Sequence, residues 1–527
     1  MKSGFRQSMA WLHTWVGLLV SWLLYFIFLT GTLGYFDSEI DQWMSPETPV
    51  FQVDGRQVIP VASKFLLENA QKSDRWRIYL PVTRSSSYLW ISYQKNKGKR
   101  HSATLNPYTG EKLVKRSTAG GQTLYKMHYR LRYLPRKIAY YIVGICTMFM
   151  LLALVTGVVV HKKIFKDFFT FRRGKKPSSW LDGHNALSVM SLPFHFMITL
   201  SGLLMLLYTL MPLVINAHYG FEKDARTQFF NDYFPRGEAS EPTGVSAEML
   251  SLEILYDKAQ QLVGKDNIIS FSITAVNDVN AQAKFNLIHK KPSDSEASIV
   301  LNAITGELIS KNLQEKGSKS FYHILLALHE GLFANTSLRW LYFLSGILGT
   351  GMIASGMILW TVKRRNKAKK NGGGNLGYRM TEGINVASII GLPIAIGAYF
   401  LANRLLPLDI AERAAWEINC LFIVWGLMTI HGILRAIFKS ADNAWVEQLN
   451  LAAAVFLLIP LISTITAPKN LFTSLVETNW VFISIEIISL LVAFSCLFLA
   501  RYLAKLFRFE LVNDLGTKPT VVPREHN

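Results

Sequence analysis

The chain has 527 residues, of which 50% are hydrophobic, and its formal net charge is +20. Runs of about 20 residues that are almost free of charge can each cross the hydrocarbon core of a bilayer, and they exclude a soluble globular protein. The basic side chains gather in short clusters beside these runs, within 162–176 and 363–370, instead of covering one soluble face, which argues against nucleic-acid binding. The composition therefore predicts an integral membrane protein.

Hydropathy predicts eight spans in chain order. They lie at residues 11–35, 138–160, 185–214, 338–361, 384–403, 415–437, 449–467 and 478–504. Lys2 and Arg6 precede the first span, which predicts a cytoplasmic N-terminus in a bacterial inner (cytoplasmic) membrane. Alternation then predicts a first span within 1–35, a periplasmic module at 36–137, a second span at 138–160, a basic cytoplasmic loop at 161–184, a third span at 185–214, a second periplasmic module at 215–337, a fourth span at 338–361, a second basic loop at 362–383, four additional spans within 384–510 and a cytoplasmic tail at 511–527.

The first four spans contain an internal repeat. Leu12–Gly17 followed by Thr30-Gly31 matches 183–188 followed by Ser201-Gly202. The separation along the sequence from His13 to His184 equals that from Gly31 to Gly202. A constant offset of this kind indicates duplication of a structural unit. We therefore expect a four-span core with pseudo-twofold symmetry about an axis along the membrane normal.

Each predicted periplasmic segment has the same internal order. A helical stretch is followed by alternating strands and then by Asn-x-x-Thr-Gly-Glu, at 106–111 and 302–307, where Asn and Gly suit a tight turn. A Met-His or Leu-His pair comes next, ending in His128 or His329, and the following span carries a small residue and glycine, Thr156-Gly157 or Ser355-Gly356. The expected fold class is thus a membrane α-helical protein of about eight transmembrane helices, with two extracytoplasmic α+β modules.

These motifs resemble the PepSY-associated transmembrane family, whose better understood members are inner-membrane ferric-siderophore reductases. The resemblance covers about residues 1–365 and leaves the last four spans outside it. It implies that the two periplasmic segments are PepSY-like modules.

Four histidines occupy equivalent depths in the two halves. His13 and His184 lie at the cytoplasmic ends of spans one and three, and His128 and His329 lie at the periplasmic approaches to spans two and four. Neutral imidazole is a common axial ligand of haem iron, and two imidazoles on opposing helices can hold the ring within a helix bundle. With no Cys-x-x-Cys-His motif, the pattern and the resemblance predict two non-covalent haem b groups with these four side chains as axial ligands. The pairs could form across the halves or within one half, and histidines at span ends also serve as plain interfacial residues.

His195 is a fifth candidate ligand. It follows His184 by eleven residues, which on a continuous helix puts it about 16 Å along the axis on nearly the same face. Its equivalent in the repeat is Leu24, so symmetry does not support ligation, and a buried hydrogen bond is the alternative. A separate basic cluster, Arg130, Arg132, Arg136 and Lys137, lies on the predicted periplasmic face. It is either a solvated rim or a site for anionic groups, such as haem propionates or an anionic metal chelate.

The function expected from these features is transmembrane electron transfer: an oxidoreductase that reduces a ferric siderophore or another ferric chelate in the periplasm. Reduction of hard Fe(III) to softer Fe(II) weakens its bonds to oxygen donors and releases the metal for uptake. No flavin or nicotinamide fingerprint follows a predicted strand, so the electron donor is expected to be a quinol or a separate reductase. The alternative is a non-redox transporter, or a PepSY membrane protein that binds peptide or regulates a protease.

Overall fold

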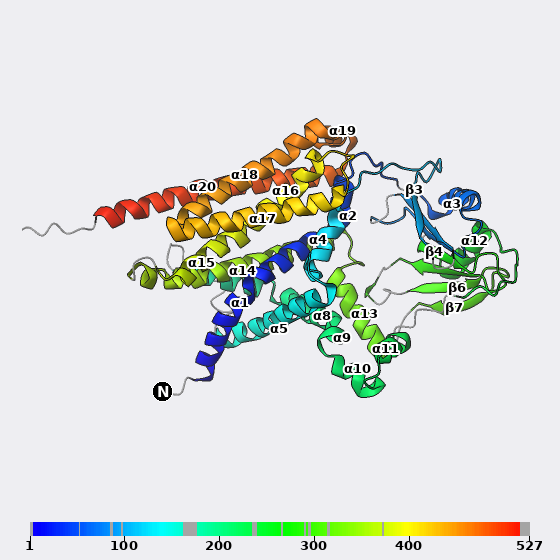
Figure 1. The fold of residues 1–527 in the computed structure, drawn as a ribbon, viewed down its shortest axis with the longest axis horizontal. Helices are drawn as coiled ribbons and strands as arrows, with labels where there is room; N and C mark the ends of the chain where they lie inside the picture. Colours follow the sequence, from blue (N-terminus) through cyan, green and yellow to red (C-terminus); the bar gives the residue numbers. More distant parts are fainter. Residues whose placement is uncertain are drawn as a thin grey trace, which may run out of the picture.

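The computed structural model describes residues 4–516, apart from 52, 85–87, 96–97, 162–176, 234–239, 265–266, 289–290, 293–296, 314–316 and 371–373. The first basic cluster, 162–176, therefore lies outside the described residues. So do residues 517–527, which make up most of the C-terminal segment predicted to be cytoplasmic, 511–527. Long helices lie side by side along the long axis of the molecule, and a β-sheet lies beyond one end of them (Figure 1). We call this end the sheet side and the opposite end, where the N-terminus lies, the far side.

The elements within residues 1–160 are α1 (Phe5–Gly34), α2 (Asp37–Trp43), α3 (Gly55–Asn69), β1 (Arg75–Tyr79), β2 (Leu89–Gln94), β3 (His101–Leu105), α4 (Gly120–Tyr129) and α5 (Arg136–Val160). Those of the second half are α7 (Pro177–Met190), α8 (Leu192–Met205), α9 (Leu207–Leu210), α10 (Pro212–Tyr219), α11 (Ala225–Tyr233), α12 (Leu252–Val263), β4 (Ile268–Thr274), β5 (Gln282–Leu287), β6 (Ser298–Asn302), β7 (Leu308–Asn312), α13 (Gly317–Glu330) and α14 (Thr336–Lys370). The remaining helices are α15 (Leu376–Val386), a π-helical turn (Ala387–Gly391), α16 (Leu392–Leu405), α17 (Arg413–Phe438), α18 (Ala441–Thr466), α19 (Leu471–Glu477) and α20 (Trp480–Gly516). From here on, the tail means all of the helices α15–α20, and not only the C-terminal segment 511–527.

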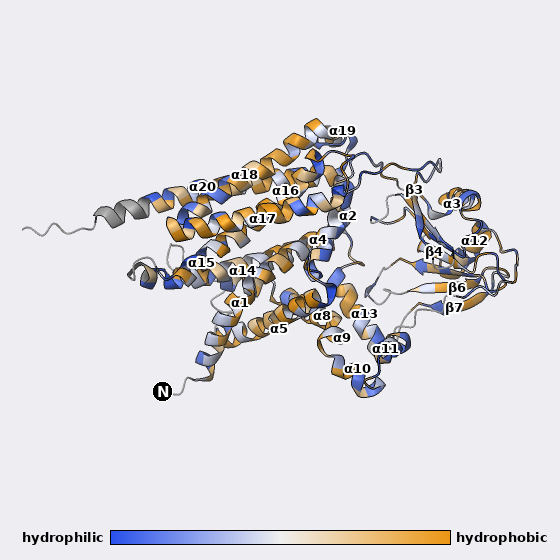
Figure 2. Ribbon diagram, in the orientation of Figure 1, coloured by the Kyte–Doolittle hydropathy of each residue, from blue (hydrophilic) through white to orange (hydrophobic). Residues whose placement is uncertain are grey.

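Among the described residues, seven helical segments are long and apolar enough to cross a membrane, and a bent helix pair is an eighth candidate. Figure 2 shows apolar residues along most of the length of these helices. The chain is therefore a multi-pass membrane protein with a small antiparallel sheet.

The third predicted span is not one helix. The structure breaks 185–214 into α7 and α8, which meet at Ser191 with a bend of 68°, and then into the short α9 and α10. Pro193 is the second residue of α8, and Pro212 is the first residue of α10. Proline lacks an N–H and restricts the residue before it, so it starts a new helix more readily than it continues one. Hydropathy alone missed the break because the run remains apolar.

The seven strands form one antiparallel sheet in the order β3-β2-β1-β4-β5-β6-β7. The first three strands lie within residues 75–105 and the last four within 268–312, and the two groups join where β1 pairs with β4 and Ile78 lies opposite Phe271. Buried side chains on alternate strand positions, such as Trp76 and Ile273, pack in one cluster with residues of α3 and α12, among them Val58 and Leu255. The two Asn-x-x-Thr-Gly-Glu stretches form turns, with φ at Gly110 of 77° and at Gly306 of 73°, as glycine at these positions predicts.

Candidate functional site

The four histidines lie in two pairs, each with one member from residues 1–160 and one from residues 177–370. On the far side, the ring centres of His13 (α1) and His184 (α7) are 6.4 Å apart. On the sheet side, those of His128 (α4) and His329 (α13) are 5.9 Å apart. Of the two arrangements left open by the sequence, the structure has pairs across the halves.

Each imidazole is held through its Nδ1 atom. The Nδ1–H of His13 donates to the Ala153 carbonyl (3.0 Å), that of His184 to the Met352 carbonyl (2.9 Å), and that of His128 to the Ile27 carbonyl (2.9 Å). A carbonyl oxygen only accepts hydrogen bonds, so Nδ1 carries the proton in these three rings. Nε2 then keeps its lone pair, which is the state of a histidine ready to bind a metal.

His329 is held by a hydroxyl. Its Nδ1 lies 2.9 Å from Ser201 Oγ, and that hydroxyl donates its own proton to the Met197 carbonyl at 2.6 Å. The serine oxygen is therefore the acceptor, and the fourth imidazole has the same tautomer as the others.

A glycine lies against every one of the four rings. A Cβ on Gly31 would lie 2.5 Å from His128 Nδ1, and one on Gly202 would lie 2.9 Å from His329 Cε1. The corresponding distances to Cε1 are 3.3 Å from Gly157 to His13 and 3.2 Å from Gly356 to His184. These glycines are the ones in the repeated small-residue–glycine pairs, so close approach of the imidazole accounts for the pattern.

Each pair borders a cavity. The far-side cavity has a volume of about 280 Å³ and the sheet-side cavity one of about 480 Å³. Both are lined mainly by apolar and aromatic side chains. Leu24 and Met150 line both cavities, so only a thin layer of side chains separates them.

Cations line both cavities. Lys363 and Arg364 border the far-side cavity. Arg130, Arg136 and Arg226 border the sheet-side cavity, which is not lined by the other two members of the predicted basic cluster, Arg132 and Lys137. Sequence reasoning missed Arg226, since it lies on the short helix α11 far from the cluster in sequence, and it assigned Lys363 and Arg364 only to membrane anchoring. An apolar cavity with cations in its lining suits a flat apolar ligand that carries carboxylates.

The sheet-side histidines are neutral at physiological pH. Burial lowers the pKa of His128, and burial together with the neighbouring His128 lowers the pKa of His329 to about 3. Both causes disfavour the imidazolium form. The neutral form is the one that binds iron.

His195 lies apart from both pairs. It is fully buried, its Nε2 lies 2.9 Å from Ser191 Oγ and 3.3 Å from the Ser345 carbonyl, and its ring packs edge-on against Phe28. Because the helix bends at Ser191, the continuous helix on which its alignment with His184 was predicted does not exist. The buried hydrogen bond is what the structure shows.

The paired rings fit axial ligation of one iron by two imidazoles. A metal–imidazole bond is about 2.0 Å long, which puts the centres of two rings bound on opposite sides of one metal about 6 Å apart. Within the described part of the chain, no group of three or more His, Cys, Asp and Glu side chains could hold a metal ion. Two protein ligands suit a metal whose other ligands come from a macrocycle, and haem is such a group.

The fold and the site define a multi-pass membrane protein with two histidine pairs at different depths. The chain belongs to the PepSY-associated TM region family, whose profile matches residues 10–363. The match includes all four paired histidines and the whole sheet, and it ends before the tail. A comparison with curated proteins found no match.

Proposed function

We propose that the protein is a haem-containing reductase of the bacterial inner membrane, which passes electrons across the membrane to a ferric siderophore or another ferric chelate in the periplasm. The observation that carries the proposal is the pair of imidazoles at each end of the core, each with Nδ1 held and Nε2 available. Histidines that only serve the interface would have no reason to meet ring against ring at two matched depths.

His13 and His184 would hold one haem b and His128 and His329 a second, both without covalent attachment. Bound between two imidazoles, haem supplies iron that cycles between Fe(III) and Fe(II) and so carries one electron at a time. The Ala153, Met352 and Ile27 carbonyls orient the ligands and keep them in the binding tautomer. The apolar linings would keep water away from a group bound there.

The cations in each cavity lining would receive the propionates. Lys363 and Arg364 serve the far-side cavity, and Arg130 and Arg136 the sheet-side cavity. Arg226 borders the larger sheet-side cavity, where it donates to the Tyr208 carbonyl (3.0 Å), and its charge favours an anionic chelate there.

The basic residues after Trp360 lie on the far side, which the positive-inside rule assigns to the cytoplasm. The sheet then lies in the periplasm and consists of two PepSY-like modules. Matched anchoring supports the proposed twofold repeat: Gly157 contacts His13 as Gly356 contacts His184, and the same holds for the sheet-side pair. Electrons would enter at the far side from a quinol or a separate reductase.

The alternative, a non-redox transporter, is favoured by one observation. The 68° break between α7 and α8 is a discontinuous helix, a feature that transporters use at their binding sites. In this chain, however, Ser191 at the break interacts with the side chain of His195, so the broken segment is closed by its own residues.

The experiment is a haem count on protein purified in detergent from cells supplied with a haem precursor. The wild type should have a Soret band that shifts on reduction with dithionite, and two haems per chain. His13→Ala or His184→Ala should remove one haem, His128→Ala or His329→Ala the other, and the exposed His218→Ala, as the control, neither. Oxidation of the reduced protein by an added ferric chelate tests the reductase activity. A colourless wild type, or four variants with full pigment, would disprove the assignment.

A further inference from the structure

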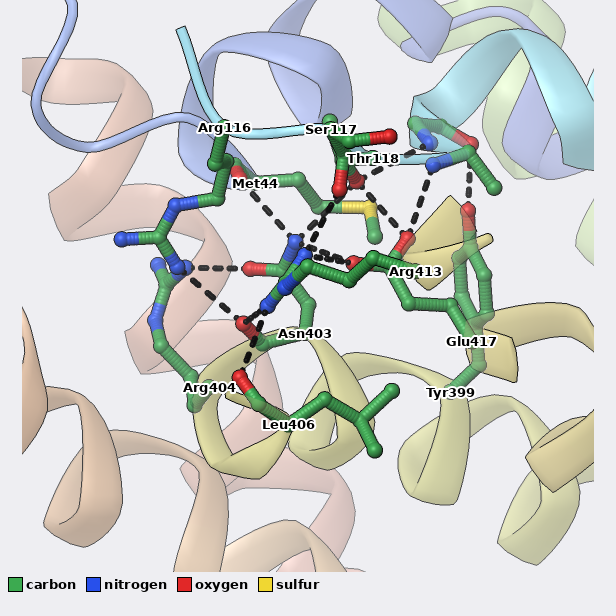
Figure 3. Close-up of polar contacts among 12 residues, drawn as sticks. Met44, Arg116, Ser117, Thr118, Tyr399, Asn403, Arg404, Leu406, Arg413 and Glu417 are labelled. Carbon is green, nitrogen blue, oxygen red and sulfur yellow. Dashed lines mark hydrogen bonds and ion pairs between the residues drawn. The ribbon is translucent and has the colours of Figure 1, made fainter. Parts of the chain in front are cut away.

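The start of helix α4, which carries His128, is joined to the tail by a buried polar network (Figure 3). Glu417 on α17 is fully buried, and its Oε2 accepts hydrogen bonds from the Thr118 hydroxyl (2.8 Å) and from the Ala119 backbone N–H (2.8 Å). A carboxylate at this place satisfies an N–H that the helix itself cannot pair, and it interacts favourably with the helix dipole.

Arg413 balances the charge of Glu417 and reaches the same segment. Its Nη1 donates to Glu417 Oε1 (2.6 Å) and to the Ser117 carbonyl (2.8 Å), and the side chain is 1% exposed. Tyr399 on α16 donates its hydroxyl proton to the Gly120 carbonyl at 2.7 Å. Side chains of the tail therefore hold every residue of 117–120.

The other side of the same turn is held by α2. The Gly121 N–H donates to Asp41 Oδ1 at 2.8 Å, and a Cβ on Gly121 would lie 2.0 Å from the Asp37 carbonyl oxygen. The backbone here fits between α2 and the tail without space for a side chain. Movement of the tail anchors would therefore move the start of α4.

α4 connects these anchors to the sheet-side site. Its ten residues begin at Gly120, and His128 lies about 12 Å further along the helix axis. At that end of α4, the His128 Nδ1–H donates its hydrogen bond to the Ile27 carbonyl, and the imidazole ring lies against Gly31. A small rotation of α4 about its start displaces the ring from this position.

We propose that the tail positions His128: Glu417, held by Arg413, fixes the start of α4 and thereby sets the place of one imidazole of the sheet-side pair. Glu417 is a positioning residue and touches neither imidazole. The inference rests on the proposed function in that the sheet-side pair is taken to bind haem. It gives the tail, which lies outside the family match, a role in the site.

The test uses Glu417→Gln in the full-length protein, with Glu447→Gln as the matched control. Glu447 lies in the same tail, where it pairs with Arg435 and His431, so its removal also breaks a membrane ion pair. Two readouts are measured: hydrogen exchange of the α4 amides, and the spectrum of the sheet-side haem in a His13→Ala background that lacks the other haem. Thr118→Ala is the milder variant if Glu417→Gln does not accumulate, because it removes a hydroxyl and leaves the buried ion pair intact.

Glu417→Gln should speed exchange of the α4 amides by about tenfold, the size expected for loss of a helix cap, while α13 is unchanged. It should also convert part of the low-spin haem into a high-spin form that binds carbon monoxide, with Thr118→Ala showing a smaller change in the same direction and Glu447→Gln none. Unchanged α4 exchange and an unchanged spectrum would overturn the inference, as would equal effects of Glu447→Gln. If the wild type holds no haem, the proposed function fails, and the exchange measurement still decides whether the tail fixes α4.

Discussion

Gly31→Ala tests whether the glycines of the small-residue–glycine pairs are needed to position the four histidine rings. The added Cβ would lie 2.5 Å from His128 Nδ1, whereas ordinary contact begins at 3.4 Å, so the ring must retreat by the difference between these distances. That shift breaks the alignment of the ring with its partner across the cavity. Disturbing the support of a metal-binding histidine typically lowers metal affinity about 10–100-fold, and this is the loss we expect for the sheet-side haem.

Gly157→Ala should have a much smaller effect on haem binding than Gly31→Ala. There the Cβ would lie 3.3 Å from His13 Cε1, only just inside the 3.4 Å of ordinary contact, so the ring hardly moves and the far-side haem should remain. Gly426→Ala, at a helix position with nothing within 4 Å, controls for the general gain of about 1 kcal/mol from alanine in a helix. The assay is the haem content per chain together with the low-spin spectrum. Two haems and a wild-type spectrum in Gly31→Ala, or a greater loss in Gly157→Ala, would refute the reasoning.

Two further predictions concern Arg226, which borders the sheet-side cavity, and Asp41, which lies on α2. Arg226→Gln should raise the KM for an anionic ferric chelate roughly tenfold and leave the rate at saturation unchanged, because it removes a charged hydrogen-bond donor from the lining; an unchanged KM in steady-state reduction assays would contradict this. Asp41→Asn should flatten the pH dependence of the thermal unfolding midpoint in detergent. Burial raises the pKa of Asp41 from 3.8 to about 6, so folding takes up a proton between these values and the wild type loses stability as the pH rises from about 4 to about 6. A variant with the same slope as the wild type over this range would show that Asp41 is not the group responsible.

The repeat indicates which histidines meet, and it does so for a physical reason. The constant sequence offset predicted equal depths for His13 and His184, and in the structure their ring centres are 6.4 Å apart. The same logic applies to His128 and His329. What anchors each ring could not be predicted, because Ala153, Met352 and Ile27 act through backbone carbonyls that no side-chain pattern reveals.

The break in the third span and the network around Glu417, which the sequence did not predict, have equally local causes. Pro193 lies inside an apolar run, so hydropathy joined α7 to α8, and the expected alignment of His195 with His184 depended on that join. The network around Glu417 depends on contacts between segments far apart in the chain, such as the one between Thr118 and α17. The hydrophobic periodicity of either segment alone does not predict these long-range contacts.

The two cavities lie at opposite ends of the helical core and differ in volume and in charge. Each cavity is bordered by one histidine pair, but the rest of the linings differ. The far-side cavity is the smaller, at about 280 Å³, and among the described residues Lys363 and Arg364 are the lysines and arginines that border it. The sheet-side cavity is about 480 Å³, and α11 adds Arg226 to its lining. Extra volume and extra positive charge at one end favour an anionic second occupant there, so the proposed reductase is expected to meet its ferric chelate at the sheet-side cavity.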